Sequence, residues 1–112
     1  MTNSVLDSTV FGEMRELMGD ALGEFITTYL DNTPLLINKI ESGLTAKDAK
    51  TVYHSAHQLK GGSGSIGANR LAAISLEIEK IGRAESVEGV APLLSQLKAE
   101  YTRVETELKL LL

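Results

Sequence analysis

Both histidines of the chain, His54 and His57, fall in one short stretch, and only one has neighbours suited to chemistry. His57 is followed three and four residues later by Lys60 and Gly61. A neutral imidazole, with an unperturbed pKa of about 6.5, is a competent nucleophile near neutral pH. The lysine can neutralise negative charge on a group held at the ring, and the glycine leaves room for a second protein. This combination predicts a phosphoryl acceptor whose active site is completed by a partner.

The segment 52–66 follows a helical pattern, which determines the side to which each residue points. At about 100° per residue, the core-facing positions share a sector of roughly 80°: Val52, Ala56, Leu59, Ser63 and Ile66. His57 lies about 140° from Val52 and therefore faces solvent, with Gly61 and Gly64 on the same side. A glycine inside a helix costs about 1 kcal/mol relative to alanine, so glycines on this exposed face favour a role in access.

The rest of the chain is helical in pattern, and Asp7 or Ser8 can cap the first helix. Apolar spacing predicts helices near residues 8–18, 21–44, from 46–49 to at least 61, 69–83 and 87–112. Pro34 interrupts the second, which we expect to be one long bent helix, with two shorter helices as the alternative. The glycines between residues 61 and 64 leave open where the third helix ends. Short connections predict an all-α fold, an antiparallel up-down four-helix bundle with a short additional N-terminal helix.

Length and composition argue against several other classes of protein. The 112 residues suit one domain, 1–112, and the 43% hydrophobic content includes few aromatic residues. The net charge of −4 and the lack of a Lys/Arg cluster argue against nucleic-acid binding. The chain has no cysteine and no apolar run as long as the roughly 18 residues that span a membrane. Residues 1–4 lack a basic stretch followed by an apolar one, so we expect no signal peptide there. We expect a cytoplasmic monomer without direct membrane contact.

The stretch around His57 also resembles a known family. His57-Gln58-Leu59-Lys60-Gly61, followed by Ser63, Gly67 and Ala68, is similar to the His-x-x-Lys-Gly motif of histidine phosphotransfer (HPt) domains. Residues 25–40, with the interruption at 31–34, resemble the second helix of that family, and residues 71–83 resemble the helix after the motif. One departure is Gly62, which stands where serine or alanine is common.

The resemblance implies a mechanism in which a phosphoryl group moves from an aspartate of one receiver domain to His57, and then to an aspartate of another. Lys60 would stabilise charge, Gly61 would give steric access, and Glu79 matches the position that orients the inner ring nitrogen of the histidine. It implies no ATP site, no kinase activity and no cofactor of its own, since Mg²⁺ belongs to the receiver. The partners would be receiver domains of response regulators and of a hybrid sensor histidine kinase.

Further positions around His57 are candidates for contact with a partner. Four lie on or beside the exposed face of the same helix: Lys50, His54, Gln58 and Gly64. His54 is most simply a solvated residue at the edge of this face. In the first helix, the apolar residues Phe11, Met14 and Met18 are expected in the core, with an apolar docking patch as the alternative.

Two other classes of function and one motif match compete with the interpretation as a phosphoryl carrier. A non-catalytic helical adaptor would use the same face only to bind protein. A metal-binding bundle would use His54-x-x-His57, but such bundles add inward-facing carboxylates from other helices, and the pattern lacks that set. Residues 62–67 match G-x-G-x-x-G, the dinucleotide fingerprint, yet no strand pattern precedes them, so we interpret the match as coincidence.

Overall fold

The computed structural model describes residues 5–112; residues 1–4, where the sequence predicts no signal peptide, lie outside the described part. The helices are α1 (Ser8–Met18), α2 (Leu22–Thr45), α3 (Ala49–Ser65), α4 (Asn69–Arg83) and α5 (Val90–Lys109), with a 3-10 turn, η1 (Gly19–Ala21), between α1 and α2. Residues 5–112 contain no strand. The predicted all-α class is therefore confirmed.

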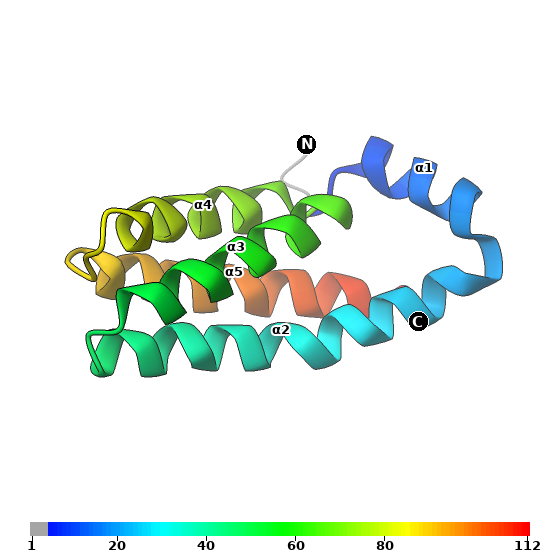
Figure 1. Ribbon diagram of the computed structural model, residues 1–112. Helices are drawn as coiled ribbons and strands as arrows, with labels where there is room; N and C mark the ends of the chain where they lie inside the picture. The colour runs from blue at the N-terminus through cyan, green and yellow to red at the C-terminus, as the bar shows by residue number, and fades with distance from the viewer. Residues whose placement is uncertain (1–4) are drawn as a thin grey trace.

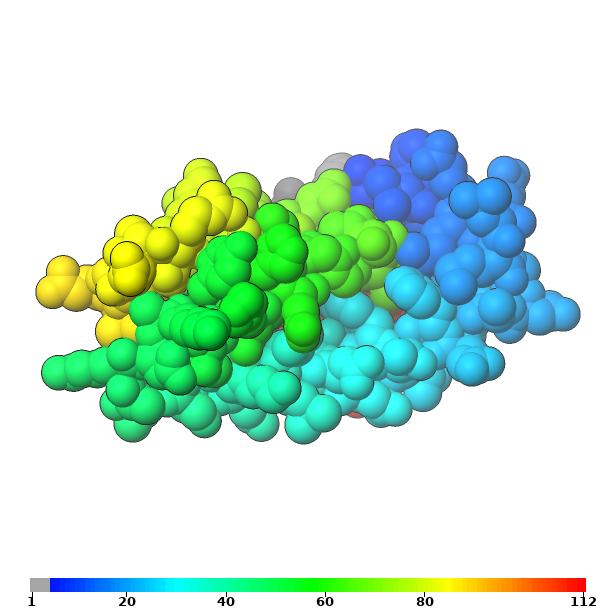
Figure 2. Space-filling model, in the orientation of Figure 1, coloured from blue at the N-terminus to red at the C-terminus, as the bar shows by residue number. Residues whose placement is uncertain are grey.

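The helices α2 to α5 form the bundle, and each runs opposite to the one before it (Figure 1). α3 packs most extensively against α4 and then against α2, while α5 closes the bundle by packing on α4 and α2. In the space-filling view α3 occupies the middle of one face, between α2 and α4 (Figure 2). α1 lies beyond one end of the bundle (Figure 1). The predicted up-down bundle with an extra N-terminal helix is confirmed.

Pro34 does not divide α2, which continues from Leu22 to Thr45. A proline has no N–H, so the carbonyl of Leu30, one turn earlier, loses its normal helical donor. The hydroxyl of Tyr101 on α5 donates a hydrogen bond of 3.4 Å to that carbonyl oxygen. A neighbouring helix thus satisfies the group that the proline leaves unpaired, and of the two alternatives the single long helix is correct.

Asp7 caps α1, as one of the two predicted choices, and also ties α1 to the bundle. Its carboxylate accepts hydrogen bonds from the first turn of α1, and its own N–H donates to the carbonyl of Gly67 at 2.8 Å. Gly67 has a φ of +84°, and a Cβ there would lie 3.2 Å from the carbonyl oxygen of Asp7. Glycine is therefore required at this position, where the α3–α4 connection contacts the start of α1.

The apolar residues of α1 differ in burial. Phe11 is buried, and Met14 and Met18 are half-buried against the core, which agrees with the expectation of a core role. Leu17, on the same helix, is 88% exposed.

The last helix is shorter than the predicted span of 87–112. α5 begins at Val90 because Gly89, with a φ of +88°, takes a left-handed conformation that a helix cannot continue. It ends at Lys109, and the following leucines are exposed. No helix within residues 5–112 is long and apolar enough to cross a membrane.

Candidate functional site

The helix that carries His57 is longer than the glycines after it suggested. Asp48 caps the start of α3 by accepting hydrogen bonds from the N–H and hydroxyl of Thr51. The helix then continues through all three glycines to Ser65. The whole predicted core stripe of α3 is buried: Val52, Ala56, Leu59, Ser63 and Ile66. His57 therefore projects from a regular helix, and its side chain is 56% exposed.

Glu79 of α4 lies beside His57, as the family resemblance implied. Its Oε2 atom is 3.2 Å from Nδ1 of His57, and its side chain is fully buried. The outer ring nitrogen, Nε2, takes no part in this contact. The ring is therefore held at Nδ1 and remains open at Nε2. The structure thus brings together the histidine predicted to be the nucleophile and the residue predicted to orient it.

The charge on Glu79 is compensated by two cations. The ammonium of Lys60 lies 2.8 Å from Oε1, and the guanidinium of Arg83 lies 2.6 Å from Oε2. Burial, the largest single influence, raises the pKa of Glu79, but the interactions with Lys60 and His57 outweigh it, so that the pKa falls below its usual 4.5. The carboxylate is therefore ionised near neutral pH and can only accept hydrogen bonds. In the neutral form of His57, the proton therefore lies on Nδ1, which donates it in a hydrogen bond to this carboxylate, and the lone pair lies on Nε2.

A close approach of two helices makes the contact between His57 and Glu79 geometrically feasible. Gly82 lies one turn after Glu79 on α4, and a Cβ built there would lie 2.8 Å from the backbone nitrogen of Tyr53 and 3.0 Å from the carbonyl oxygen of Ala49. Only glycine allows this distance between the backbones of α3 and α4.

Tyr53 and Arg83 surround the same site, and the sequence analysis missed both. The rings of Tyr53 and His57 are stacked, with 6.0 Å between their centroids and an angle of 18° between their planes. The Arg83 guanidinium lies over the Tyr53 ring, 5.8 Å from its centroid. A signal was available, since Tyr53 precedes His57 by one helical turn and Arg83 follows Glu79 by one turn.

The remaining predicted positions lie around the histidine on the surface of α3. His54, Gln58, Gly61 and Gly64 are exposed. The ring of His54 contacts the Tyr53 ring edge to face, at 5.0 Å. A Cβ at Gly61 or Gly64 would meet nothing within 4 Å. The fold itself therefore does not require glycine at either place.

Lys50 is exposed near the start of α3. It lines a shallow hollow between α3 and α4 together with Tyr53 and Arg83, among other residues. The structure therefore places Lys50 beside the aromatic side of the site rather than at the histidine itself.

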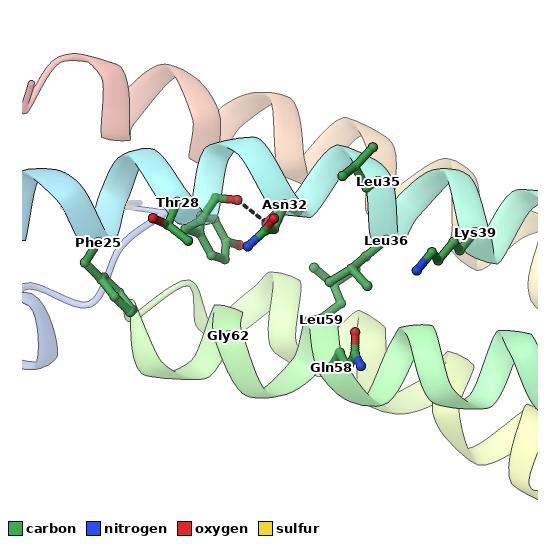
Figure 3. Close-up of a pocket in the computed structure, with 11 residues that line it drawn as sticks. Phe25, Thr28, Asn32, Leu35, Leu36, Lys39, Gln58, Leu59 and Gly62 are labelled. Atoms are coloured by element: carbon green, nitrogen blue, oxygen red, sulfur yellow. Dashed lines mark hydrogen bonds between the residues drawn. The ribbon is translucent and has the colours of Figure 1, made fainter.

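A groove of about 480 Å³ runs between α2 and α3 on the other side of the histidine. Phe25 and Leu36 of α2 point toward α3, where Gly62 leaves space, and Gln58 stands at the edge (Figure 3). A Cβ at Gly62 would make ordinary contact with the Tyr29 ring at 3.7 Å, so the departure from the family pattern widens the groove. The walls of this groove are mostly apolar.

The competing patterns find little support in the geometry. Among residues 5–112, no group of three or more His, Cys, Asp or Glu side chains is arranged to hold a metal ion. The G-x-G-x-x-G match at residues 62–67 covers the last turn of α3 and the connection to α4, with a helix before it. The dinucleotide fingerprint requires a strand at that place.

Comparison with known proteins assigns the family. The Hpt domain family model matches residues 24–107. Histidine-containing phosphotransfer protein 5 of Arabidopsis thaliana is 30% identical over 106 residues, covering 88% of this chain and 68% of that protein. The aerobic respiration control sensor protein ArcB of Escherichia coli is 26% identical over 101 residues, covering 89% of this chain but 13% of that protein.

Solved structures agree with this assignment. The crystal structure of histidine-containing phosphotransfer protein B (HptB) from Pseudomonas aeruginosa matches with a TM-score of 0.92 and 28% identity, covering 96% of this chain and 94% of that one. The HPT domain of a sensor hybrid histidine kinase from Shewanella matches with a TM-score of 0.81 and 25% identity, covering 96% and 93%. The chain belongs to the HPt family and acts in phosphotransfer within two-component phosphorelays.

Proposed function

We propose that His57 is the residue that carries the phosphoryl group, between an aspartate of one receiver domain and an aspartate of another. The observation that carries this proposal is the contact of Nδ1 with the buried carboxylate of Glu79, at 3.2 Å, on an exposed ring. In the neutral ring, that contact keeps the proton on Nδ1 and leaves the lone pair on Nε2. A nucleophile with a fixed tautomer and an open approach suits transfer between proteins.

In the proposed step, the Nε2 lone pair of His57 forms a bond to phosphorus while the bond from phosphorus to the aspartyl oxygen breaks. The aspartate leaves as a carboxylate with the bonding electrons. The ring gains positive charge as it keeps its Nδ1 proton, and the Glu79 carboxylate stabilises that charge. Transfer to the second receiver reverses these bond changes. Lys60, one turn from His57, supplies positive charge beside the phosphoryl oxygens.

The partner would supply the parts that this site lacks. We propose that Mg²⁺ is held by the receiver domain, that this chain has no cofactor of its own, and that it has no ATP-dependent kinase activity. The receiver would dock over Gly61 and the groove between α2 and α3, next to Gln58, with His54, Lys50 and Gly64 at the edges of the contact. Apolar walls beside a polar reacting group are typical of transient docking surfaces.

The finer features of the partnership are also proposals. We infer that the donors and acceptors are receiver domains of response regulators and of a hybrid sensor histidine kinase. One of the relatives, ArcB, is named as a sensor protein, and one solved neighbour is the HPT domain of a hybrid histidine kinase. We further propose that residues 1–112 act as one domain, as a cytoplasmic monomer.

Label transfer tests this function directly. The protein is incubated with a receiver that carries a radioactive phosphoryl group, and acid-labile, base-stable label on this chain identifies phosphohistidine. We expect label on the wild type and on the matched control His54→Gln, because His54 is exposed on the same helix but has no contact with Glu79. We expect none on His57→Gln. Label on His57→Gln would make His54 the acceptor, and an unlabelled wild type would exclude the relay.

A further inference from the structure

The buried carboxylate of Glu79 has more cationic partners than one carboxylate needs. Lys60 lies 2.8 Å from Oε1, whereas Arg83 and the Nδ1–H of His57 share Oε2, at 2.6 and 3.2 Å. One negative charge is thus matched by two permanent positive charges and one hydrogen bond. The arrangement allows one cation to leave without exposing Glu79 to the cost of an unpaired buried charge.

Of the two cations, Lys60 is the one that the proposed function also needs beside the phosphoryl group. In the proposed transfer it must turn toward the phosphoryl group on Nε2, yet in this structure its ammonium is bound to Oε1 of Glu79. Turning away would leave the buried carboxylate short of positive charge, which is strongly unfavourable when no other cation is present. Arg83 is that other cation.

The position of Arg83 lets it pair with Glu79 but does not let it easily replace Lys60 at the phosphoryl group. It lies one turn after Glu79 on the same helix, so their pairing does not depend on the approach of α3. Its guanidinium lies 5.8 Å from the centroid of the Tyr53 ring, which in turn stacks beside His57 at 6.0 Å. A cation over an aromatic ring is favoured, and the planar guanidinium suits that place better than an ammonium.

We propose that Arg83, seated over Tyr53, is a positioning residue that holds the charge of Glu79 and so releases Lys60 to the phosphoryl group. The release of Lys60 to the phosphoryl group rests on the proposed function. The compensation of the Glu79 charge by Arg83, called the charge-holding half below, does not. Tyr53 supports it by fixing the guanidinium and the histidine ring against each other.

The charge-holding half is tested by stability alone. The shift in the urea midpoint caused by Lys60→Gln is measured in the wild type and in Arg83→Gln. We expect a small shift when Arg83 is present and a clearly larger one when it is absent, because only then does Glu79 lose both cations. Equal shifts in the two backgrounds would overturn the inference, whatever the transfer assay shows.

The release of Lys60 is tested by the rate of label uptake from a phosphorylated receiver. We expect Arg83→Gln to slow uptake by roughly five- to tenfold, Arg83→Lys to recover most of the loss, and Arg83→Gln to have little further effect on Lys60→Gln. The matched control is Arg70→Gln, because Arg70 is on α4 and pairs with a different buried carboxylate, Glu100, at 3.5 Å. It should transfer at the wild-type rate.

The outcomes separate this inference from the proposed function. If the wild type is labelled on His57 but the effects of Arg83→Gln and Lys60→Gln on the rate simply multiply, Arg83 does not act through Lys60 and the inference fails. The same conclusion follows if Arg83→Gln transfers as fast as Arg70→Gln. An unlabelled wild type instead counts against the relay through His57, and the stability measurement still decides whether Arg83 holds the charge of Glu79.

Discussion

Glu79 and His57 are 22 positions apart in the sequence, yet Oε2 of one lies 3.2 Å from Nδ1 of the other. The first side chain is fully buried, whereas the second is more than half exposed. The contact therefore joins the interior of the bundle to its exposed surface. In the neutral ring this contact defines the tautomer, because an ionised carboxylate can only accept a hydrogen bond and Nδ1–H must donate it.

Replacing Glu79 by glutamine tests that consequence. Glu79→Gln keeps the shape but offers an amide that can donate as well as accept, so we expect the Nδ1–H form of the His57 ring to lose population. Phosphoryl uptake should slow by about tenfold, the lower range for residues that orient a histidine. Ring-nitrogen NMR shifts report the tautomer. Glu77→Gln, which is exposed on the same helix, is the control, and an unchanged tautomer in Glu79→Gln would contradict the prediction.

A side chain at Gly61 should separate folding from transfer. A Cβ there meets nothing within 4 Å, so Gly61→Gln should fold and gain up to about 1 kcal/mol of helix stability. Uptake from a phosphorylated receiver should nevertheless slow by more than about tenfold, because the side chain stands beside His57 where the receiver must approach. Gly12→Gln, at an equally open glycine of α1, is the matched control. Normal transfer by Gly61→Gln would remove the clearance argument.

Leu35 tests the docking groove. Its side chain is 59% exposed and lines the groove between α2 and α3. We expect Leu35→Gln to keep the fold and to weaken receiver binding by about 1 kcal/mol or more, measured by titration calorimetry. Leu17→Gln removes a leucine that is 88% exposed outside the groove, and it should bind normally. Equal affinities for the two variants would place the docking surface elsewhere.

Gly82 tests the helix approach that positions Glu79. A Cβ in Gly82→Ala would lie 2.8 Å from the Tyr53 backbone, so α3 and α4 must move apart. We expect a loss of about 1 to 3 kcal/mol in the free energy of unfolding, typical of an overpacked core. Urea denaturation measures it, with Gly12→Ala as the control at an open glycine of α1. A Gly82→Ala protein as stable as the control would show that the approach is not tight.

Lowering the pH should decrease the contribution of Glu79 to the free energy of unfolding. Its pKa in the folded protein lies below the usual 4.5, since Lys60 and His57 outweigh the effect of burial. The ionised carboxylate therefore stabilises the folded state above about pH 4.5, and this contribution is lost as the pH falls through the folded-state pKa. We expect the difference in unfolding free energy between the wild type and Glu79→Gln to decrease from about pH 6 to about pH 3.

The comparison with Glu79→Gln also removes the effect of other carboxylates on the pH dependence of stability. Hydrogen bonding from the N–H of Val10 lowers the pKa of Asp7, and the hydroxyl of Thr51 lowers that of Asp48. Both aspartates are present in the wild type and in Glu79→Gln, so their effects on stability cancel in the difference. A difference that stays constant with pH would contradict the assigned shift of Glu79.

The sequence by itself determined the features that depend on local periodicity. The exposed face of His57, with Gly61 and Gly64 beside it, follows from the helical repeat of 3.6 residues, as does the buried stripe behind it. Long amphipathic helices with short connections were enough to predict the bundle. Glu79 was named only through resemblance to a family, because no periodic pattern relates two residues on different helices.

The tertiary structure decided what depends on how one helix is placed against another. It continued α3 through its glycines to Ser65, since the buried side of that helix is held by its neighbours. It brought α4 so close at Gly82 that Glu79 reaches His57, and it gave Arg83 its place over Tyr53. These contacts arise from the register and distance between two helices, which packing determines and the spacing of residues along either helix does not contain.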